Sequence, residues 1–216
     1  MKFLNIDGSL RIKNPQDTLS QALKSGHKCV ITRIADISTL TEPGNKIPTT
    51  SAIRPNAIIQ QTSNGKGLTK LNAQVSAIME SIELQHAETI EGLITIKGTR
   101  CDLLLGGFNV YTLKDLLYDS EFISNHYVEH ENQLIDYLNA SVYSNKHGVL
   151  KQEHCLIPAA AAIFQVFPYH VRAISTNGLA SGNSIEEASI HGILEIVERD
   201  SVAKGKKGEI EVKSLT

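Results

Sequence analysis

The chain of 216 residues is organised around residues 175–202, which read S-T-N-G-L-A-S-G-N-S-I-E-E-A-S-I-H-G-I-L-E-I-V-E-R-D-S-V. This stretch begins as a polar turn that contains glycines and continues as an apolar periodic run. Ser184 is a good N-cap residue, and Glu187 follows three positions later, which together predict a capping box. We therefore expect a helix that begins near Ile185.

One stripe of this predicted helix is acidic. With about 100° between successive residues, the stripe contains Glu187, His191, Glu195 and Glu198. Apolar residues flank the stripe on both sides: Ile190, Ile193, Leu194 and Val197 on one, Ile185 and Ile196 on the other. Carboxylates between apolar flanks predict a polar seam inside the protein rather than a solvated helix face.

Residues 63–85 repeat this construction. They begin with Asn64-Gly65, as the first stretch begins with Asn177-Gly178, so each predicted helix follows an Asn-Gly turn. Each helix then carries a Glu-x-x-Glu pair, and the i,i+3 spacing places both carboxylates of a pair on one side. The two pairs are Glu80 with Glu83, and Glu195 with Glu198.

The first acidic pair has no local cationic partner, because no lysine or arginine occurs between Lys70 and Lys97. If the two seams face each other, each close carboxylate pair repels by roughly 4 kcal/mol at about 4 Å with an effective dielectric of about 20. A cation is therefore expected between them. Carboxylate oxygens suit a hard cation, Mg²⁺ first, held together with waters and substrate phosphates.

A structural interpretation of the same residues stays open. In it, Glu187 only caps the helix, Glu195 pairs with Arg199 at i,i+4, and Glu80 and Glu83 are exposed. The chain would then be an α/β protein whose carboxylates are structural. Two copies of the acidic pattern, each on a helix with apolar flanks, make the functional interpretation about as strong as this one.

Composition excludes several classes of function. The net charge of −2 and a pI of about 6.4 provide no basic surface for nucleic acid. No apolar run is long enough to span a bilayer, and the first residues do not form a signal peptide, so we expect no membrane contact. The three cysteines form no C-x-x-C pattern, which favours free thiols and a cytoplasmic location.

The remaining pattern predicts a mixed α/β fold in which β-sheets pack with helices. A first helix is expected over residues 15–25, with Asn14 as N-cap and Gly26 as its end. A second is expected over residues 131–143. Strands are expected over residues 27–34, 47–53, 93–96, 101–105 and 171–175.

Several motifs of the chain resemble the YcaO family. These are N-G-K-G-L-T at 64–69, S-A-I-M-E-S-I-E at 76–83, and S-T-N-G-L-A-S-G-N at 175–183 followed by E-A-x-x-H-x-x-x-E-x-x-E-R-D at 187–200. Upstream, T-R-I-A-D-I-S-T-L at 32–40 and I-P-T-T-S-A-I-R-P at 47–55 are similar to the entry segment of members that work with a TfuA partner. The resemblance extends over residues 15–200.

The resemblance implies a YcaO-like fold that binds ATP and Mg²⁺ outside a P-loop, and the chain indeed lacks G-x-x-x-x-G-K-[ST]. It implies phosphorylation of a peptide backbone amide, leading to a thioamide or an azoline, with no nucleophilic side chain on the protein. The implied Mg²⁺ ligands are Glu80, Glu83, Glu195 and Glu198. The implied nucleotide contacts are Ser76, Asn183, Glu187 and Arg199, with Arg11 and Thr18 as looser matches.

The resemblance also sets expectations for partners and organisation. We expect a peptide or protein substrate, a TfuA-like sulfur-delivery partner and a homodimer. Residues 1–216 are expected to form a single, incomplete YcaO-type domain, the N-terminal half to two-thirds of the family domain, truncated at its C-terminus. The alternative function is a non-catalytic remnant that serves as a nucleotide- or peptide-binding assembly module.

Overall fold

The structure, a computed structural model, describes residues 3–6, 9–40, 47–88, 90–116, 132–146, 149–164 and 175–208. Its chain divides into two compact units: unit 1 comprises residues 1–86 and 176–216, and unit 2 comprises residues 87–175. The single domain expected over residues 1–216 stays a prediction. Most of the strand expected at 171–175 lies outside the described residues.

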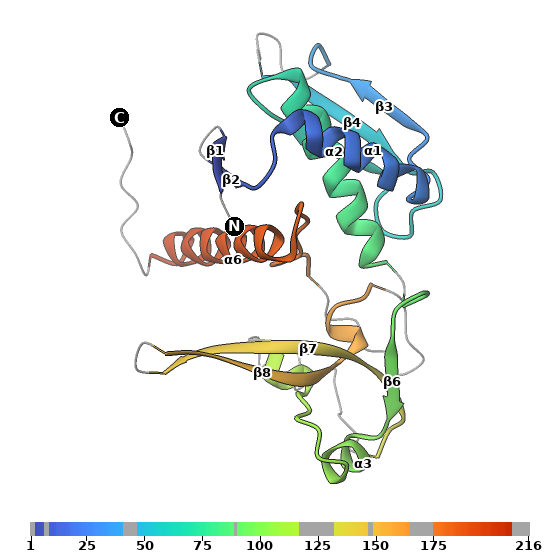
Figure 1. Ribbon diagram of the computed structural model, residues 1–216, viewed down its shortest axis with the longest axis vertical. Coiled ribbons are helices and arrows are strands. Elements are labelled where there is room, and N and C mark those ends of the chain that lie inside the picture. The colour runs from blue at the N-terminus through green and yellow to red at the C-terminus, as the bar shows by residue number, and fades with distance from the viewer. Residues whose placement is uncertain are drawn as a thin grey trace. The chain divides into compact units, whose positions relative to one another are not determined.

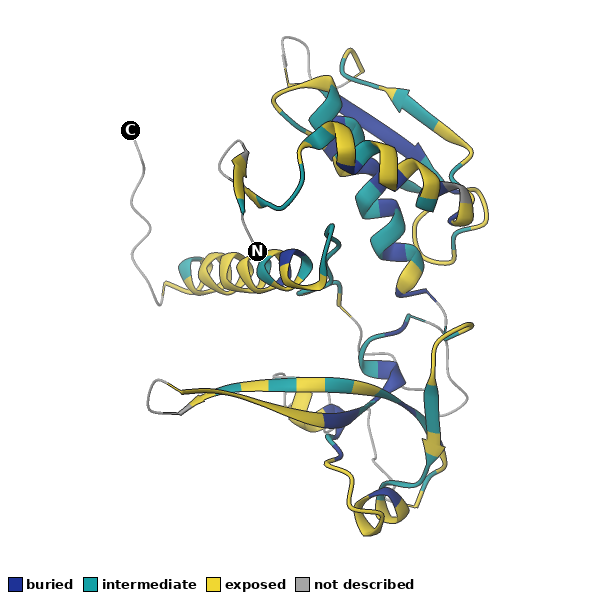
Figure 2. Cartoon of the chain, viewed as in Figure 1, coloured by how far each residue is buried: buried dark blue, intermediate teal, exposed yellow. Residues whose placement is uncertain are grey.

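Unit 1 contains an antiparallel sheet with the strand order β3-β4-β5 (Figure 1). Its strands are β3 (Arg33–Asp36), β4 (Thr49–Ile53) and β5 (Thr62–Lys66). Ala52 of β4 pairs with Ile34 of β3 and with Ser63 of β5. Because β4 has hydrogen-bonded neighbours on both edges and is almost wholly buried (Figure 2), it is the core strand of this sheet. The strand predicted at 47–53 is confirmed.

Two helices, α1 (Pro15–Lys28) and α2 (Lys70–His86), pack together, and α2 also packs along β4 and β5. Asn14 Oδ1 accepts the Asp17 N–H over 2.9 Å, as an N-cap does. The helix continues through Gly26, so the predicted end at this residue and the strand predicted from residue 27 are wrong. A Cβ at Gly26 would lie 3.2 Å from Ile31, so this glycine serves close packing.

The glycine of Asn64-Gly65 also serves close packing. Both residues lie within strand β5, so the turn predicted there is wrong. A Cβ at Gly65 would lie 2.1 Å from Ala77 N and 2.3 Å from Ala73 O. Only glycine lets β5 lie this close to the backbone of α2, which fixes α2 against the sheet at Ala73 and Ala77.

The remaining elements of unit 1 are the hairpin strands β1 (Leu4–Ile6) and β2 (Ser9–Arg11) and the long helix α6 (Ile185–Lys206). The Ser184 hydroxyl accepts the Glu187 N–H over 3.2 Å, which confirms the predicted cap. The predicted internal seam is confirmed only at Glu187, which is buried, because most of the apolar flank of α6 is solvent-exposed. Ile193, Leu194 and Val197 are 60%, 59% and 56% exposed, and Figure 2 shows most of α6 in the exposed colour.

Unit 2 contains a second antiparallel sheet with the strand order β6-β7-β8. The strands are β6 (Thr95–Gly98), β7 (Ile135–Lys146) and β8 (Val149–Pro158), and the short helices are α3 (Arg100–Leu105), α4 (Leu113–Leu116) and η1 (Ala159–Ala161). One cluster of its core consists of Leu103, Val110, Ile135, Tyr137 and Leu156.

Two sequence predictions fail in unit 2. The helix expected over residues 131–143 is largely strand β7, where Ile135 and Tyr137 face the core with a period of two. The strand expected at 101–105 is helix α3, because the Thr99 hydroxyl accepts the Asp102 N–H over 3.1 Å and caps it. The predicted mixed α/β class is nonetheless confirmed. In the part of the chain that the structure describes, no helix is long and apolar enough to cross a bilayer.

Candidate functional site

Unit 1 contains a pocket of about 710 Å³, a volume typical of small-molecule and cofactor sites. It is bounded by the segment after β2, the start of α1, the exposed side of α2, residues 176–183 and α6. The polar and charged side chains that line it are Arg11, Lys13, Thr18, Gln60, Lys66, Asn72, Ser76, Glu80, Glu83, Thr176, Ser181, Asn183, Glu187, His191, Glu195 and Arg199.

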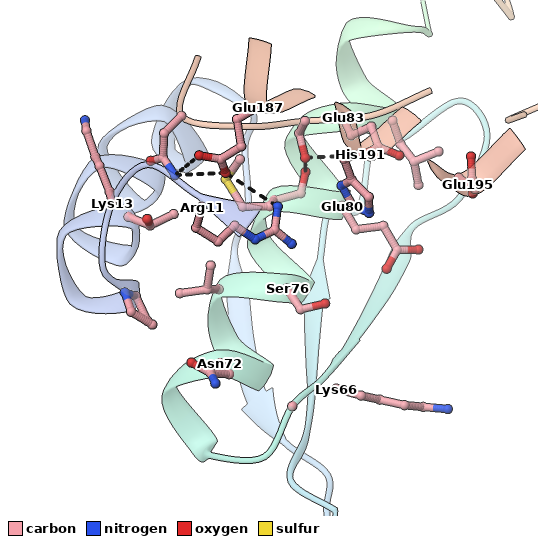
Figure 3. Close-up of a pocket in the computed structure, with 18 of the residues that line it drawn as sticks. Arg11, Lys13, Lys66, Asn72, Ser76, Glu80, Glu83, Glu187, His191 and Glu195 are labelled. Atoms are coloured by element: carbon pink, nitrogen blue, oxygen red, sulfur yellow. Dashed lines mark hydrogen bonds and ion pairs between the residues drawn. The ribbon is translucent and has the colours of Figure 1, made fainter. Parts of the chain in front are cut away.

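One end of the pocket is acidic. Glu80 and Glu83 of α2 lie beside His191 and Glu195 of α6 in the view of Figure 3. Burial raises the pKa of Glu83 to about 7, and the neighbouring charges of Glu80 and Glu195 also raise it. Burial raises the pKa of Glu80 too. Buried carboxyls with raised pKa values in a pocket are candidates for a ligand site.

Ser181 joins the two acidic helices. Its hydroxyl lies 3.2 Å from Glu83 Oε2 and 3.3 Å from the Met79 carbonyl oxygen, and it can donate to either acceptor. This contact ties residues 176–183, which lead into α6, to the acidic turn of α2. Sequence analysis did not single out Ser181, although it lies within the quoted S-T-N-G-L-A-S-G-N motif.

Both oxygens of Glu195 have donors. Glu195 Oε2 accepts the Gly178 N–H over 2.9 Å, and Oε1 accepts from Arg199 over 2.8 Å. Arg199 donates in addition to Asn177 Oδ1 over 2.7 Å. Gly178 has a φ of +78°, and a Cβ there would lie 2.7 Å from Ile196, so the predicted Asn-Gly turn needs its glycine. The i,i+4 pair of the structural interpretation is thus present, but at the wall of the pocket.

Glu187 is buried, with 3% of its surface exposed, and its carboxylate accepts hydrogen bonds from another part of unit 1. Glu187 Oε2 accepts the Ile12 N–H over 2.9 Å, and Asn183 Nδ2 lies 3.2 Å from Oε1. Arg11 forms an ion pair with the same carboxylate at 3.5 Å. Glu187 therefore holds the end of β2 and the segment after it against α6, and these carry Arg11 and Lys13 to the pocket (Figure 3).

The structure brings most of the predicted site residues into this pocket. Seven of the eight line it: Ser76, Glu80, Glu83, Asn183, Glu187, Glu195 and Arg199. Arg11, Thr18 and His191 line it too. Glu198 does not, and its side chain is exposed. The metal and nucleotide roles of all these residues stay predictions.

The donor set fits a metal held partly by other ligands. Among the described residues, no three histidine, cysteine or carboxylate side chains lie close enough to hold an ion by themselves. Mg²⁺ is commonly bound by one or two carboxylates with waters and substrate phosphates, which does not need such a cage. The oxygen donors of Glu80, Glu83 and Glu195, beside cationic Arg11 and Lys13, suit a metal that enters with an anionic ligand.

Comparison with known proteins agrees with the motif resemblance. The model of the family "YcaO cyclodehydratase, ATP- and Mg²⁺-binding" matches residues 64–215, more than half of the chain. An uncharacterised protein of Mycobacterium tuberculosis is 31% identical over 94% of this chain and 44% of its own length. An uncharacterised protein of Methanothermobacter thermautotrophicus is 32% identical over 84% of this chain and 45% of its own length. The chain thus spans less than half the length of these relatives.

Solved structures show the same fold. The YcaO structure from Methanopyrus kandleri, bound with AMPPCP and Mg²⁺, has a TM-score of 0.68 at 22% identity and covers 100% of this chain and 52% of that chain. A heterocyclase in complex with substrate and cofactor has a TM-score of 0.69 at 23% identity and covers 94% of this chain and 30% of that chain. The family match and these similarities together lead to one conclusion: the chain belongs to the YcaO family.

Proposed function

We propose that this chain binds ATP and Mg²⁺ in the unit 1 pocket and uses them to activate a peptide backbone amide. The observation that carries the proposal is the meeting of two acidic helical turns, at Glu80 and Glu83 and at Glu195, in a pocket that is also lined by cationic side chains. Opposite charges in one pocket suit a metal triphosphate, because the carboxylates bind the cation and the basic groups bind phosphate oxygens. The family description supports the same ligands.

The chain's residues would act by binding and positioning. Glu80, Glu83 and Glu195 would provide metal oxygens, while Glu198 stays in the proposed set on its i,i+3 spacing alone. Arg199, with Ser76 and Asn183, would contact the nucleotide. When bound, Mg²⁺ would neutralise the phosphate charge during phosphoryl transfer. No nucleophilic side chain is needed, since the attacking atom belongs to the substrate.

The reaction class follows from the YcaO resemblance. The amide oxygen of the peptide forms a bond to the γ-phosphorus, and the bond from that phosphorus to the leaving ADP breaks. A nucleophile then adds to the amide carbon, and phosphate leaves with the former amide oxygen. A Cys, Ser or Thr side chain as nucleophile gives an azoline, whereas supplied sulfide gives a thioamide. The TfuA-type segments at 32–40 and 47–55 favour the thioamide and a sulfur-delivery partner. The homodimer is proposed separately.

Calorimetric titration of the purified chain with AMPPCP, with and without Mg²⁺, tests the ligands. The wild type should bind the nucleotide with Mg²⁺, and Glu80→Gln or Glu195→Gln should lower the metal-dependent affinity by about ten-fold or more, since each removes a charged ligand. Glu153→Gln, an exposed carboxylate of unit 2, is the control and should leave binding unchanged. Unaltered metal-dependent affinity in both pocket variants would contradict the proposal.

A nucleotide- or peptide-binding assembly module without turnover is the second candidate. The observation that keeps it is that, among the described residues, no three potential metal ligands lie close enough to hold an ion by themselves. Phosphate release from ATP, measured with and without candidate precursor peptides, separates the two functions. Peptide-stimulated release supports the amide-activating enzyme, and nucleotide binding without any release supports the module.

A further inference from the structure

The Arg199 guanidinium donates to Glu195, one of the carboxylates proposed as metal ligands. Its guanidinium lies 2.8 Å from Glu195 Oε1 and 2.7 Å from Asn177 Oδ1, so two acceptors hold it in place. The other oxygen of Glu195 accepts the Gly178 N–H. Glu195 thus has a donor on each oxygen, and one of the donors is a full positive charge.

A cation on Glu195 opposes metal binding in two ways. The guanidinium occupies one lone pair of Oε1 and the space beside it that a metal would need, and its charge repels a divalent ion at the same carboxylate. Glu83 shows the contrasting condition: its charged neighbours include Glu80 and Glu195, and these raise its pKa together with burial. Before any ligand binds, Glu195 therefore has a cationic partner, whereas the charged groups that shift the pKa of Glu83 are carboxylates.

A triphosphate changes this balance. Two oxygens of one phosphate group can accept from a guanidinium at the same time, and the group can carry two negative charges. It is therefore a stronger partner for Arg199 than one carboxylate oxygen. Arg199 lies at the pocket wall and is half-exposed, so its side chain can turn from Glu195 to a phosphate without leaving its helix. Glu195 Oε1 then becomes available to the metal that accompanies the nucleotide.

We propose that Arg199 makes metal binding by this chain depend on the nucleotide. It neutralises Glu195 while the pocket holds no phosphate, and it moves to the phosphates when they bind. This inference rests on the proposed function and goes beyond the phosphate contact that the resemblance implies, because it assigns Arg199 a second position. It predicts opposite signs for one substitution: Arg199→Gln should strengthen binding of metal alone and weaken binding of nucleotide.

Titration of the full chain with Mn²⁺ tests the first sign, with loss of the six-line electron paramagnetic resonance signal of the hydrated ion as the readout. Arg199→Gln should bind Mn²⁺ alone about ten-fold more tightly than the wild type, because a competing charge at the ligand is gone. Lys204→Gln is the matched control. It removes the cation of another i,i+4 pair on α6, Lys204 with Asp200 at 2.7 Å, and should leave Mn²⁺ binding unchanged.

The second sign is measured with AMPPCP. In Arg199→Gln, the increase in AMPPCP affinity caused by Mg²⁺ should be about ten-fold smaller than in the wild type, since metal and nucleotide no longer share the arginine. If Arg199→Gln binds Mn²⁺ alone no more tightly than the wild type, the inference is overturned. If instead the wild type fails to bind AMPPCP with Mg²⁺, the proposed function fails, and the Mn²⁺ comparison still decides the competition at Glu195.

A second variant covers the case in which Arg199→Gln fails to fold, which circular dichroism would show. Asn177→Ala keeps the cation and removes one of its two anchors. It should strengthen binding of Mn²⁺ alone in the same direction by roughly two- to three-fold, because a less restrained guanidinium competes less well. An unchanged affinity in a folded Asn177→Ala protein would count against the inference as directly as the first variant.

Discussion

The Ser181 hydroxyl lies 3.2 Å from Glu83 Oε2, although 98 positions separate the two residues in the sequence. This contact links the segment before α6 to the acidic turn of α2. It also lowers the pKa of Glu83 against the larger effect of burial, so it supports the ionised carboxylate that a metal requires. Ser181 is therefore a positioning residue for the proposed site.

Ser181→Ala should lower the Mg²⁺-dependent affinity for AMPPCP by about ten-fold, because hydrogen bonds to charged groups contribute about 1.5 kcal/mol or more. Calorimetric titration measures the change. Ser201→Ala is the matched control, since the Ser201 hydroxyl donates only within α6, to the Val197 carbonyl, and does not line the pocket. Equal affinities in the two variants would show that the Ser181 hydroxyl contributes nothing to the site.

Glu83 should make the metal-free protein less stable as pH rises. Its folded-state pKa of about 7 exceeds the ordinary 4.5, so the folded protein keeps a proton that the unfolded chain has lost, and stability falls between these values. Glu83→Gln removes this loss. With chelator present, its stability relative to the wild type should rise by on the order of 1–2 kcal/mol between about pH 4.5 and 7.5, after allowance for partial exposure.

Denaturant unfolding at several pH values measures this difference. Glu186→Gln is a useful control, because Ser184 lowers the pKa of the exposed Glu186 carboxyl. The pH dependence of its effect on stability should be confined to values below the ordinary 4.5, so its difference from the wild type should stay constant from about pH 4.5 to 7.5. A difference between Glu83→Gln and the wild type that is constant from pH 4.5 to 7.5 would contradict the assigned burial of Glu83.

Gly65→Ala should destabilise unit 1 severely. The added Cβ would lie 2.1 Å from Ala77 N, and neither β5 nor α2 can shift without breaking the sheet or the helix. We expect a loss of about 3 kcal/mol or more in the free energy of unfolding. Gly106→Ala is the control, since its Cβ would come no closer than 3.3 Å and its φ is negative. Thermal unfolding compares the two, and equal melting temperatures would contradict the packing.

Glu187→Ala should release the segment between β2 and α1. It leaves the Ile12 N–H without its carboxylate acceptor and removes the partner of Arg11, at an expected cost of about 2–3 kcal/mol. Hydrogen exchange of the Ile12 amide should then accelerate. The neighbouring exposed Glu186→Ala should not change it. If Glu187→Ala lowers nucleotide affinity but leaves this exchange rate unaltered, Glu187 acts on the ligand directly and not through the segment.

Local sequence signals predicted the parts of this structure that depend on local contacts. The caps at Asn14 and Ser184 marked the starts of α1 and α6, and i,i+3 spacing placed Glu80 with Glu83 on one side of α2. These signals work because capping and helical periodicity involve residues fewer than five positions apart. The T-x-x-D cap at Thr99 was equally local and could have identified α3.

Contacts between distant residues left no such signal. The sequence indicates a turn at Gly65. The contact that requires glycine there is with the backbone of α2 at Ala73 and Ala77, which the neighbouring sequence does not reveal. Strand β7 looked helical, because its core positions are decided by pairing with β6 and β8. The ion pair of Arg11 with Glu187 crosses 176 positions, and nothing near either residue indicates the other.

The discontinuity of unit 1 has a consequence for biosynthesis. Its pocket is lined by residues from Arg11 to Leu84 and again from Thr176 to Arg199, with unit 2 encoded between them. A growing polypeptide on the ribosome therefore carries half of the pocket through the translation of almost a hundred further codons before the other half emerges. Binding of the proposed nucleotide therefore cannot stabilise the early stages of folding. Glu80 and Glu83 lack the α6 side of the pocket until that helix has been synthesised.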